Sequence, residues 1–184
     1  MTTLKVIHFP DERLRLKAFP VKEIGPETSV IAENMLETMY SEGGIGLAAT
    51  QVNIQERIVV IDLSEDKNEP IILINPEILK LEGKEVTQEG CLSVPDYFDV
   101  VERAKNIEFR YSTIKNEIIT KKVDGLLAIC IQHEIDHLDG KLFIDYLSPL
   151  KRNRLKKKIR KQKTEKNRFK KSERLENKSL NKIL

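Results

Sequence analysis

Apolar side chains recur at helical spacing in the first third of the chain. Between Pro26 and Tyr40, the side chains of Ile31, Met35 and Met39 follow one another at intervals of four residues. This period predicts an amphipathic helix whose apolar stripe faces the core. Pro26 suits the first turn, where no backbone N–H is needed.

A second helical stretch, from Gly125 to about Asp139, is apolar on nearly every face. Such a pattern predicts a buried helix. Asp124 is a suitable N-cap, and Gly140 can end the helix. The polar side chains at positions 132–134 and 136–137 therefore need partners inside the protein.

Short runs rich in Ile and Val predict strands at Arg57–Leu63 and Ile71–Ile74, with a break at Asn75-Pro76. A second strand pair is expected at Val100–Tyr111 and Glu117–Val123. The mixture of helices and strands predicts an α+β fold. We expect antiparallel or mixed sheets around the buried helix, with one helix N-terminal and another C-terminal to them.

The two ends of the chain differ in character. Residues 1–25 read as an extended entry with a turn at 10–13, and His8 is expected to be structural or exposed. Ser148 and Pro149 suit the start of a third helix that runs to about Lys163. Beyond it, apolar residues are too sparse for independent folding. We expect a domain over residues 1–148 and a basic helix and tail over residues 149–184.

Charge divides the chain in the same way. The 184 residues carry a formal net charge of +3, yet residues 151–184 hold 16 Lys and Arg against three Asp and Glu. The body before them is acidic, so the basic tail points to an anionic partner. Two cysteines give no disulfide framework, and neither a secretory signal nor a membrane-spanning run is evident. A reducing compartment, the cytoplasm, is therefore expected.

The buried helix carries the pattern H-E-x-x-H at His133, Glu134 and His137. At about 1.5 Å and 100° per residue, the two histidines lie on one helical face about 6 Å apart. That spacing suits two imidazoles that share one cation. Glu134 flanks them and can take a proton from water without binding the metal. The pattern is typical of metallohydrolases.

A third protein ligand would leave one metal position open for water. Phe143 occupies the place where an extended histidine motif needs its last ligand, and the next glutamate, Glu165, lies in the basic tail. Two cysteines remain. Cys130 lies about 7 Å along the helix axis from a metal held between the histidines, which its side chain cannot bridge, so it is expected to be a pocket or core residue. Cys91, between Gly90 and Pro95, is either the ligand or a buried thiol.

The glycine-rich stretch from Gly43 to Gly46 follows a helix and leads into small apolar residues. A nucleotide-binding loop should instead follow a strand and open a helix. Glycines at this density permit the close approach of another backbone, such as an extended peptide substrate. A plain turn remains an equal alternative.

Three blocks together resemble the peptide deformylase family of bacterial and organellar metalloenzymes, in its short-insert bacterial class. They are Gly44–Gln51, Glu89–Ser93 and Gln132–His137. The resemblance covers most of the chain. It implies hydrolytic removal of the formyl group from N-formylmethionine on nascent polypeptides, by a monomer that also docks on the ribosome through its basic C-terminal helix. Neither DNA nor a membrane is an expected partner.

The resemblance also implies roles for single residues. Cys91, His133 and His137 would hold Fe²⁺, which Zn²⁺ or Ni²⁺ can replace. Glu134 would transfer protons, while the Gln51 side chain and the Leu92 backbone N–H would stabilise the oxyanion. Glu89 and Arg103 would support the ligands, unless they form an ordinary salt bridge. The remaining implied residues bind substrate: Ile45, Gly46, Gly90, Leu126, Ile129 and Cys130.

The chain departs from the family pattern at Glu102, where many members have proline, and at the bulky pair Tyr97-Phe98. Both departures concern the rim of the site and therefore side-chain preference. Two other functions remain open. One is a metallopeptidase that cleaves internal peptide bonds, and the other is a metal-stabilised ribosome-binding module without catalysis.

Overall fold

The computed structural model describes residues 2–161, and the chain divides into two compact units, Met1–Tyr146 and Leu147–Leu184. The first unit is an α+β fold. Its elements are η1 (Glu12–Arg15), α1 (Pro26–Ser41), β1 (Gly46–Ala48), η2 (Ala49–Val52), β2 (Ile58–Ile61), β3 (Ile71–Glu82), β4 (Glu85–Cys91), β5 (Val94–Arg103), β6 (Asn106–Ser112), β7 (Ile118–Asp124), α2 (Gly125–Leu138) and η3 (Phe143–Tyr146).

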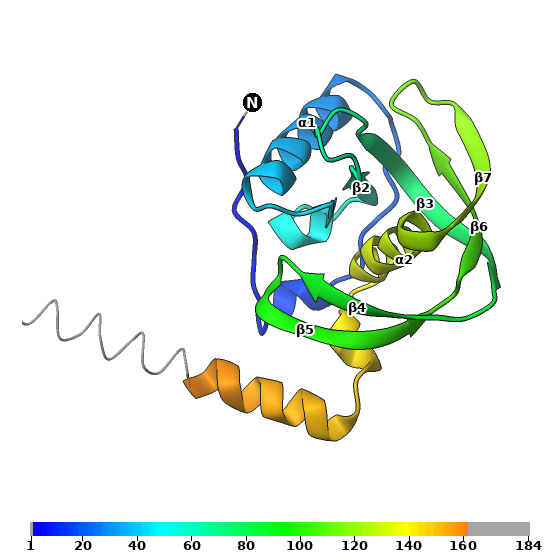
Figure 1. The fold of residues 1–184 in the computed structure, drawn as a ribbon. Coiled ribbons are helices and arrows are strands. Elements are labelled where there is room, and N and C mark those ends of the chain that lie inside the picture. Colours follow the sequence, from blue (N-terminus) through cyan, green and yellow to red (C-terminus); the bar gives the residue numbers. More distant parts are fainter. Residues whose placement is uncertain (1, 162–184) are drawn as a thin grey trace, which may run out of the picture. The chain divides into compact units, whose positions relative to one another are not determined.

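A five-stranded antiparallel sheet, ordered β1-β2-β3-β6-β7, separates the two helices of this unit. Residues of β2 alternate between its two faces. Ile58 and Val60 pack in the cluster that contains Met35 of α1, whereas Val59 and Ile61 pack in the cluster that contains residues of α2. In Figure 1, α2 lies between this sheet and the β4–β5 hairpin. The predicted wrapping of sheets around the central helix is confirmed.

The strand β3 continues through the predicted break at Asn75-Pro76. Asn75 adopts a positive φ of 51°, and the register with β6 shifts between Ile74 and Glu77. The Asn75 side chain accepts a hydrogen bond from Val21 N–H and donates one to Val21 O. The chain therefore forms a bulge here, which absorbs the proline and lets the strand run on.

The predicted strand Val100–Tyr111 is two strands in different sheets. Its first part belongs to β5, which pairs only with β4 among the described residues, and its second part is β6. The chain leaves one sheet for the other at Ala104 and Lys105. The hairpin of β4 and β5 was not anticipated. Its first strand ends at Cys91.

The helix α2 begins and ends within a residue of the predicted limits. Asp124 is at the N-cap position, but its side chain makes no capping hydrogen bond. Gly125 takes φ +57° at the turn from β7 into the helix. At the other end, Gly140 has φ +73°, and Lys141 N–H donates to Asp136 O. Gly140 thus ends the helix as predicted.

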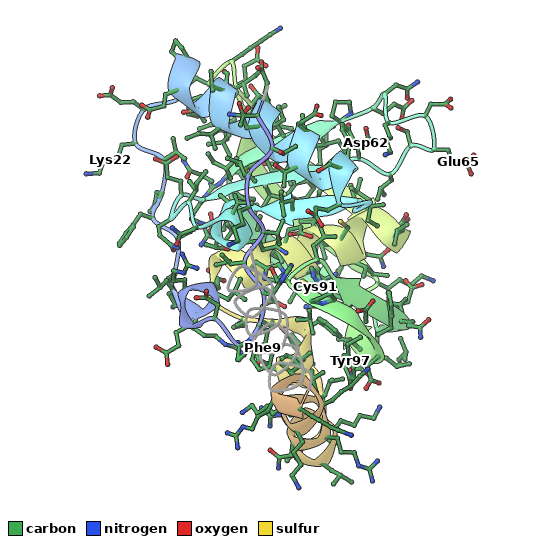
Figure 2. All side chains as sticks on the ribbon, turned by 90° about the vertical axis from the view of Figure 1, so that its left-hand side faces the viewer. Phe9, Lys22, Asp62, Glu65, Cys91 and Tyr97 are labelled. Atoms are coloured by element: carbon green, nitrogen blue, oxygen red, sulfur yellow. The ribbon has the colours of Figure 1, made fainter. Side chains whose placement is uncertain are left out.

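The N-terminal segment links two distant parts of the unit. Ile7 N–H donates to Gln51 O in η2, and Phe9 N–H donates to Ser93 O in the β4–β5 turn. In Figure 2, Cys91 lies in the middle of the unit near α2, whereas Lys22 and Glu65 lie at its outer edge.

In the second unit, residues 149–161 form a helix. Ser148 Oγ accepts a hydrogen bond from Lys151 N–H at 3.4 Å, as expected for its N-cap. The predicted continuation to Lys163 and the tail beyond it lie outside the described residues.

Within residues 2–161, no helix has both the length and the apolar character that membrane crossing requires.

Candidate active site

The donor atoms of Cys91, His133 and His137 converge beside α2. His133 Nε2 lies 3.2 Å from His137 Nε2, and Cys91 Sγ lies 3.1 Å from His137 Nε2. All three donor atoms are within 4.8 Å of one another. A cation about 2.0–2.3 Å from each donor requires separations of this size. The three side chains therefore fit one metal ion, and Cys130 is not among them.

The sharp turn after β4 delivers Cys91 to the helix. Cys91 pairs with Val94, so only Leu92 and Ser93 separate the two strands. A two-residue connection of this kind fixes the strand ends rigidly. The Leu92 backbone therefore lies next to the thiol in the same turn.

The surroundings of the two histidines shift their pKa values in opposite directions. Burial lowers the pKa of His137 well below its usual value, so this imidazole is neutral and able to bind a metal. Burial would also lower the pKa of His133, but hydrogen bonds with Cys91 and Glu89 raise it well above the usual value. Metal binding to the metal-free site would therefore release a proton from His133.

Glu89 supports His133 from behind. Its Oε2 lies 2.8 Å from His133 Nδ1, and Arg103 donates to both of its oxygens at 2.7 and 3.0 Å. Burial alone would raise the pKa of Glu89, yet the bonds from His133 and Arg103 lower it to about 2. Glu89 is therefore an anion that orients the His133 ring with Nε2 toward the cluster.

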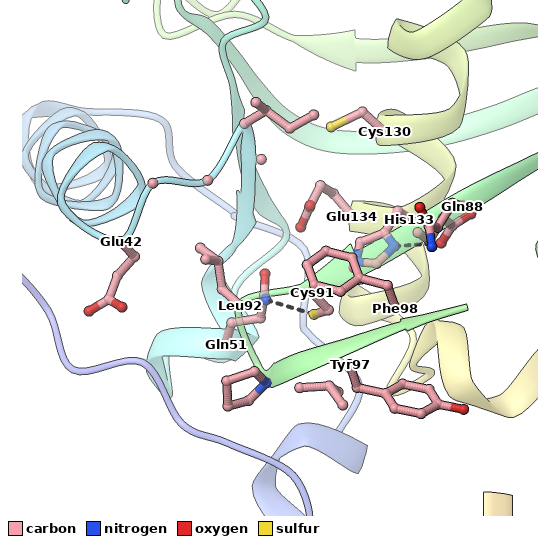
Figure 3. Close-up of a pocket in the computed structure, with 18 of the residues that line it drawn as sticks. Glu42, Gln51, Gln88, Cys91, Leu92, Tyr97, Phe98, Cys130, His133 and Glu134 are labelled. Atoms are coloured by element: carbon pink, nitrogen blue, oxygen red, sulfur yellow. Dashed lines mark hydrogen bonds and ion pairs between the residues drawn. The ribbon is translucent and has the colours of Figure 1, made fainter. Parts of the chain in front are cut away.

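Glu134 is buried at 4% exposure, and its Oε2 has no hydrogen-bond partner in the described part of the chain. Burial is the main reason why its pKa is raised to about 7. Glu134 lines the pocket, as Figure 3 shows. Gly46 lies next to the Glu134 carboxylate, and a Cβ atom at this position would lie 2.6 Å from Glu134 Oε1. Gly46 thus leaves the space that this carboxylate occupies.

Gln51 reaches the site from η2. Its Oε1 accepts a hydrogen bond from Ala48 N–H at 2.8 Å, while Nε2 donates to Ser93 Oγ at 3.2 Å and to Cys91 Sγ at 3.5 Å. A dashed line joins Gln51 and Cys91 in Figure 3. These contacts direct the amide N–H₂ toward the metal cluster.

A pocket of about 560 Å³ opens beside Glu134. Every residue that the resemblance implied for substrate binding lines it: Ile45, Gly46, Gly90, Leu126, Ile129 and Cys130. Leu126, expected to be buried, is 57% exposed because it forms part of this opening. Phe98 lies over Gly90, where a Cβ atom would come within 2.4 Å of its ring.

Several residues near the site were not anticipated. His8 is exposed, as expected, but it also lines the pocket. Ser93 holds the Gln51 amide, while Asp136 and Tyr146 contact the far side of Arg103. For Asp136 a signal existed, because a carboxylate on a buried helix needs a partner. Ser93 ends the block Glu89–Ser93, but nothing in the local pattern indicates its contact with Gln51 or the contact of Tyr146 with Arg103.

Comparisons with known proteins agree with this geometry. A model of the polypeptide deformylase family matches residues 3–153. A peptide deformylase of Pseudoalteromonas translucida (strain TAC 125) is 57% identical over 162 residues, which cover 88% of this chain and 97% of that protein.

Solved structures are similar as well. A peptide deformylase from Legionella pneumophila has a TM-score of 0.84 and 42% identity over 91% of this chain and 99% of that one. One from Ehrlichia chaffeensis in complex with actinonin has a TM-score of 0.83 and 37% identity over 88% of this chain and 98% of that one. The chain therefore belongs to the polypeptide deformylase family, hydrolases that remove the N-terminal formyl group from nascent peptides.

Proposed function

We propose that this deformylase holds one divalent metal ion, Fe²⁺ in the cell, with Cys91, His133 and His137. The observation that carries the proposal is the convergence of three donor atoms within 4.8 Å. Zn²⁺ or Ni²⁺ can substitute, because imidazole and thiolate also bind these ions. A bound cation supplies Lewis acidity, which activates a water molecule and polarises the formyl carbonyl.

Glu134 serves as the general base and then as the general acid. Glu134 lines the pocket, its Oε2 has no hydrogen-bond partner among the described residues, and a pKa near 7 in the metal-free site suits an exchange of protons near neutral pH. The carboxylate accepts a proton from the attacking water. It returns that proton to the amine that leaves when the formyl C–N bond breaks.

Gln51 and Leu92 stabilise the negative charge that grows on the formyl oxygen. The Gln51 amide is held by Ala48 and Ser93, so its N–H₂ is oriented before substrate binds. The Leu92 N–H belongs to the rigid turn beside Cys91. Donors fixed in advance stabilise a developing oxyanion without reorganisation at the moment of reaction.

The methionine side chain of the substrate enters the apolar part of the pocket formed by Ile45, Leu126, Ile129 and Cys130. Gly46 and Gly90 leave room for the substrate backbone at the entrance. Tyr97 and Phe98 line the outer rim and therefore influence the preference beyond methionine.

A formyl-Met-Ala dipeptide tests the reaction. We expect stoichiometric release of formate with Met-Ala left intact, whereas a metallopeptidase would release alanine. Glu134→Gln should lower kcat by roughly 10²–10⁴-fold, because a general base typically contributes this much. A variant that deformylates at the wild-type rate would refute the role of Glu134.

We further propose a monomeric, cytoplasmic enzyme in which residues 1–148 are catalytic and residues 149–184 dock on the ribosome. The exposed lysines at 156–158 in the second unit support this role. Replacing all three with Gln should weaken ribosome binding and its salt dependence, while activity on short peptides is retained. Unchanged ribosome affinity would exclude these lysines from the docking surface.

A further inference from the structure

Asp136 is a buried carboxylate on α2 that no proposed chemical step uses. It is 8% exposed and lies one residue before the ligand His137. Its Oδ2 accepts hydrogen bonds from Arg103 and from the Tyr146 hydroxyl, the latter at 2.8 Å. Lys141 Nζ lies 3.9 Å from the other oxygen. A buried charge held by such partners is fixed in position.

Arg103 is fixed on three sides. Glu89 accepts two of its hydrogen bonds and Asp136 a third. The ring of Tyr146 lies beside the guanidinium, with its centroid 4.6 Å from Cζ. Tyr146 therefore contacts Arg103 directly through its ring and indirectly through Asp136.

The same set of contacts reaches the metal cluster through Glu89. Glu89 Oε2 is shared between Arg103 and His133 Nδ1, and His133 Nε2 is one of the converging donors. If Arg103 moves toward Asp136, it must move away from Glu89. The position of His133 consequently depends on how Asp136 holds Arg103.

We propose that Tyr146 and Asp136 are positioning residues of the metal site, which act on His133 through Arg103 and Glu89. The Tyr146 hydroxyl satisfies Asp136, so that Arg103 stays centred between the two carboxylates. Glu89 then keeps the His133 ring in the orientation that directs Nε2 at the ion. This inference rests on the proposed function, in which His133 is a ligand.

The test is the rate at which Co²⁺-loaded protein releases its metal to a chelator, followed by the visible absorption of Co²⁺. Tyr146→Phe removes the hydroxyl but keeps the ring beside Arg103. We expect release 10–100-fold faster than in the wild type, the usual effect of losing a partner behind a metal ligand. The Fe²⁺-loaded variant should show a lower kcat with little change in KM.

Tyr40→Phe is the matched control. It removes a hydroxyl–carboxylate hydrogen bond of the same kind, from Tyr40 to Asp62 at 2.6 Å, that does not involve the metal cluster. Its release rate should equal that of the wild type. Wild-type release from Tyr146→Phe, or equal acceleration in both variants, would overturn the inference.

His133→Ala separates this inference from the proposed function. Retention of Co²⁺ with a wild-type spectrum in that variant would refute the ligand assignment itself. If His133→Ala loses the metal while Tyr146→Phe releases it at the wild-type rate, the positioning inference fails and the ligand assignment stands.

Discussion

Gly46 and Glu134 are so close that the glycine cannot carry a side chain without displacing the carboxylate. A Cβ atom on Gly46 would lie 2.6 Å from Glu134 Oε1 and 2.8 Å from Cys130 Sγ. The two residues come from β1 and α2, which pack against each other. The location of Glu134, the proposed base, thus depends on the absence of a Cβ atom at position 46.

Replacing Gly46 with Ala should therefore impair catalysis more than metal binding. A displacement of about 1 Å can cost roughly 10²-fold in rate, and we expect a loss of kcat of this order. Steady-state kinetics with formyl-Met-Ala, together with metal analysis, measures both effects. Gly25→Ala is the control, because nothing lies within 4 Å of its added Cβ. Wild-type kcat in Gly46→Ala would contradict the steric argument.

Gln51→Leu should lower kcat by roughly 10²–10³-fold, the usual effect of losing one oxyanion donor. KM should change little, since the donor acts mainly on charge that develops in the transition state. The variant also loses the bonds to Ala48 and Ser93, so its melting temperature must be compared with that of the wild type. A rise in KM with unchanged kcat would assign Gln51 to substrate binding instead.

Glu89 should make the metal-free protein sensitive to acid. Its pKa is about 2 in the folded protein against an ordinary value of 4.5, so its contribution is present above pH 4.5 and is lost as the pH falls toward 2. A shift of this size corresponds to about 3 kcal/mol. Urea unfolding between pH 2 and 7 should show this loss in the wild type and not in Glu89→Gln.

Glu77→Gln provides the comparison for that experiment. Glu77 also pairs with an arginine, Arg110, but its side chain is 59% exposed. Exposed pairs contribute little to stability, so the pH dependence of this variant should match the wild type. A Glu89→Gln variant with the same acid sensitivity as the wild type would argue against the coupling of Glu89 to Arg103 and His133.

The two thiols should react differently with an alkylating reagent. Cys91 is half-buried, whereas Cys130 is buried and burial raises its pKa well above the usual value. In metal-free protein we expect modification of Cys91 alone, and added Zn²⁺ should slow it. Mass spectrometry of the peptides distinguishes the sites. Labelling of Cys91 at the same rate with and without metal would contradict its role as a ligand.

Sequence reasoning succeeded where one local period or motif determines the outcome. Apolar spacing predicted α1, and the motif from His133 to His137 placed two donors on one face of α2. Gly140 marked the helix end, since it can take a positive φ. Such features depend on neighbours in the chain and are therefore readable without knowledge of the fold.

The β4–β5 hairpin was not predicted because its pattern of polar and apolar residues is partly reversed. Glu89 and Arg103 face inward, while Val86 and Phe98 are exposed. Polar residues inside and apolar residues outside are the opposite of what alternation normally indicates. The inward charges are tolerated because they neutralise one another and hold His133. The part of the fold that sequence reasoning missed is thus the part that supports the candidate metal site.

Contacts between separate segments of the chain could not be predicted from the sequence either. Tyr146 follows Asp136 by ten residues, and nothing in the sequence indicates that these two side chains are in contact. The switch of sheets at Ala104 and Lys105 is marked by neither glycine nor proline, so Val100–Tyr111 read as one strand. Both features become clear only when separate elements have been brought together.

The residues that the site brings together are synthesised at different times during translation. Ile7 and Phe9 pair with Gln51 and Ser93, yet His137 is made 130 residues after Ile7. Contacts between residues so far apart in the sequence require the closure of a long loop, which makes them slow to form. A ribosome that carries a partly made copy therefore displays no working site, and activity begins only after α2 has emerged.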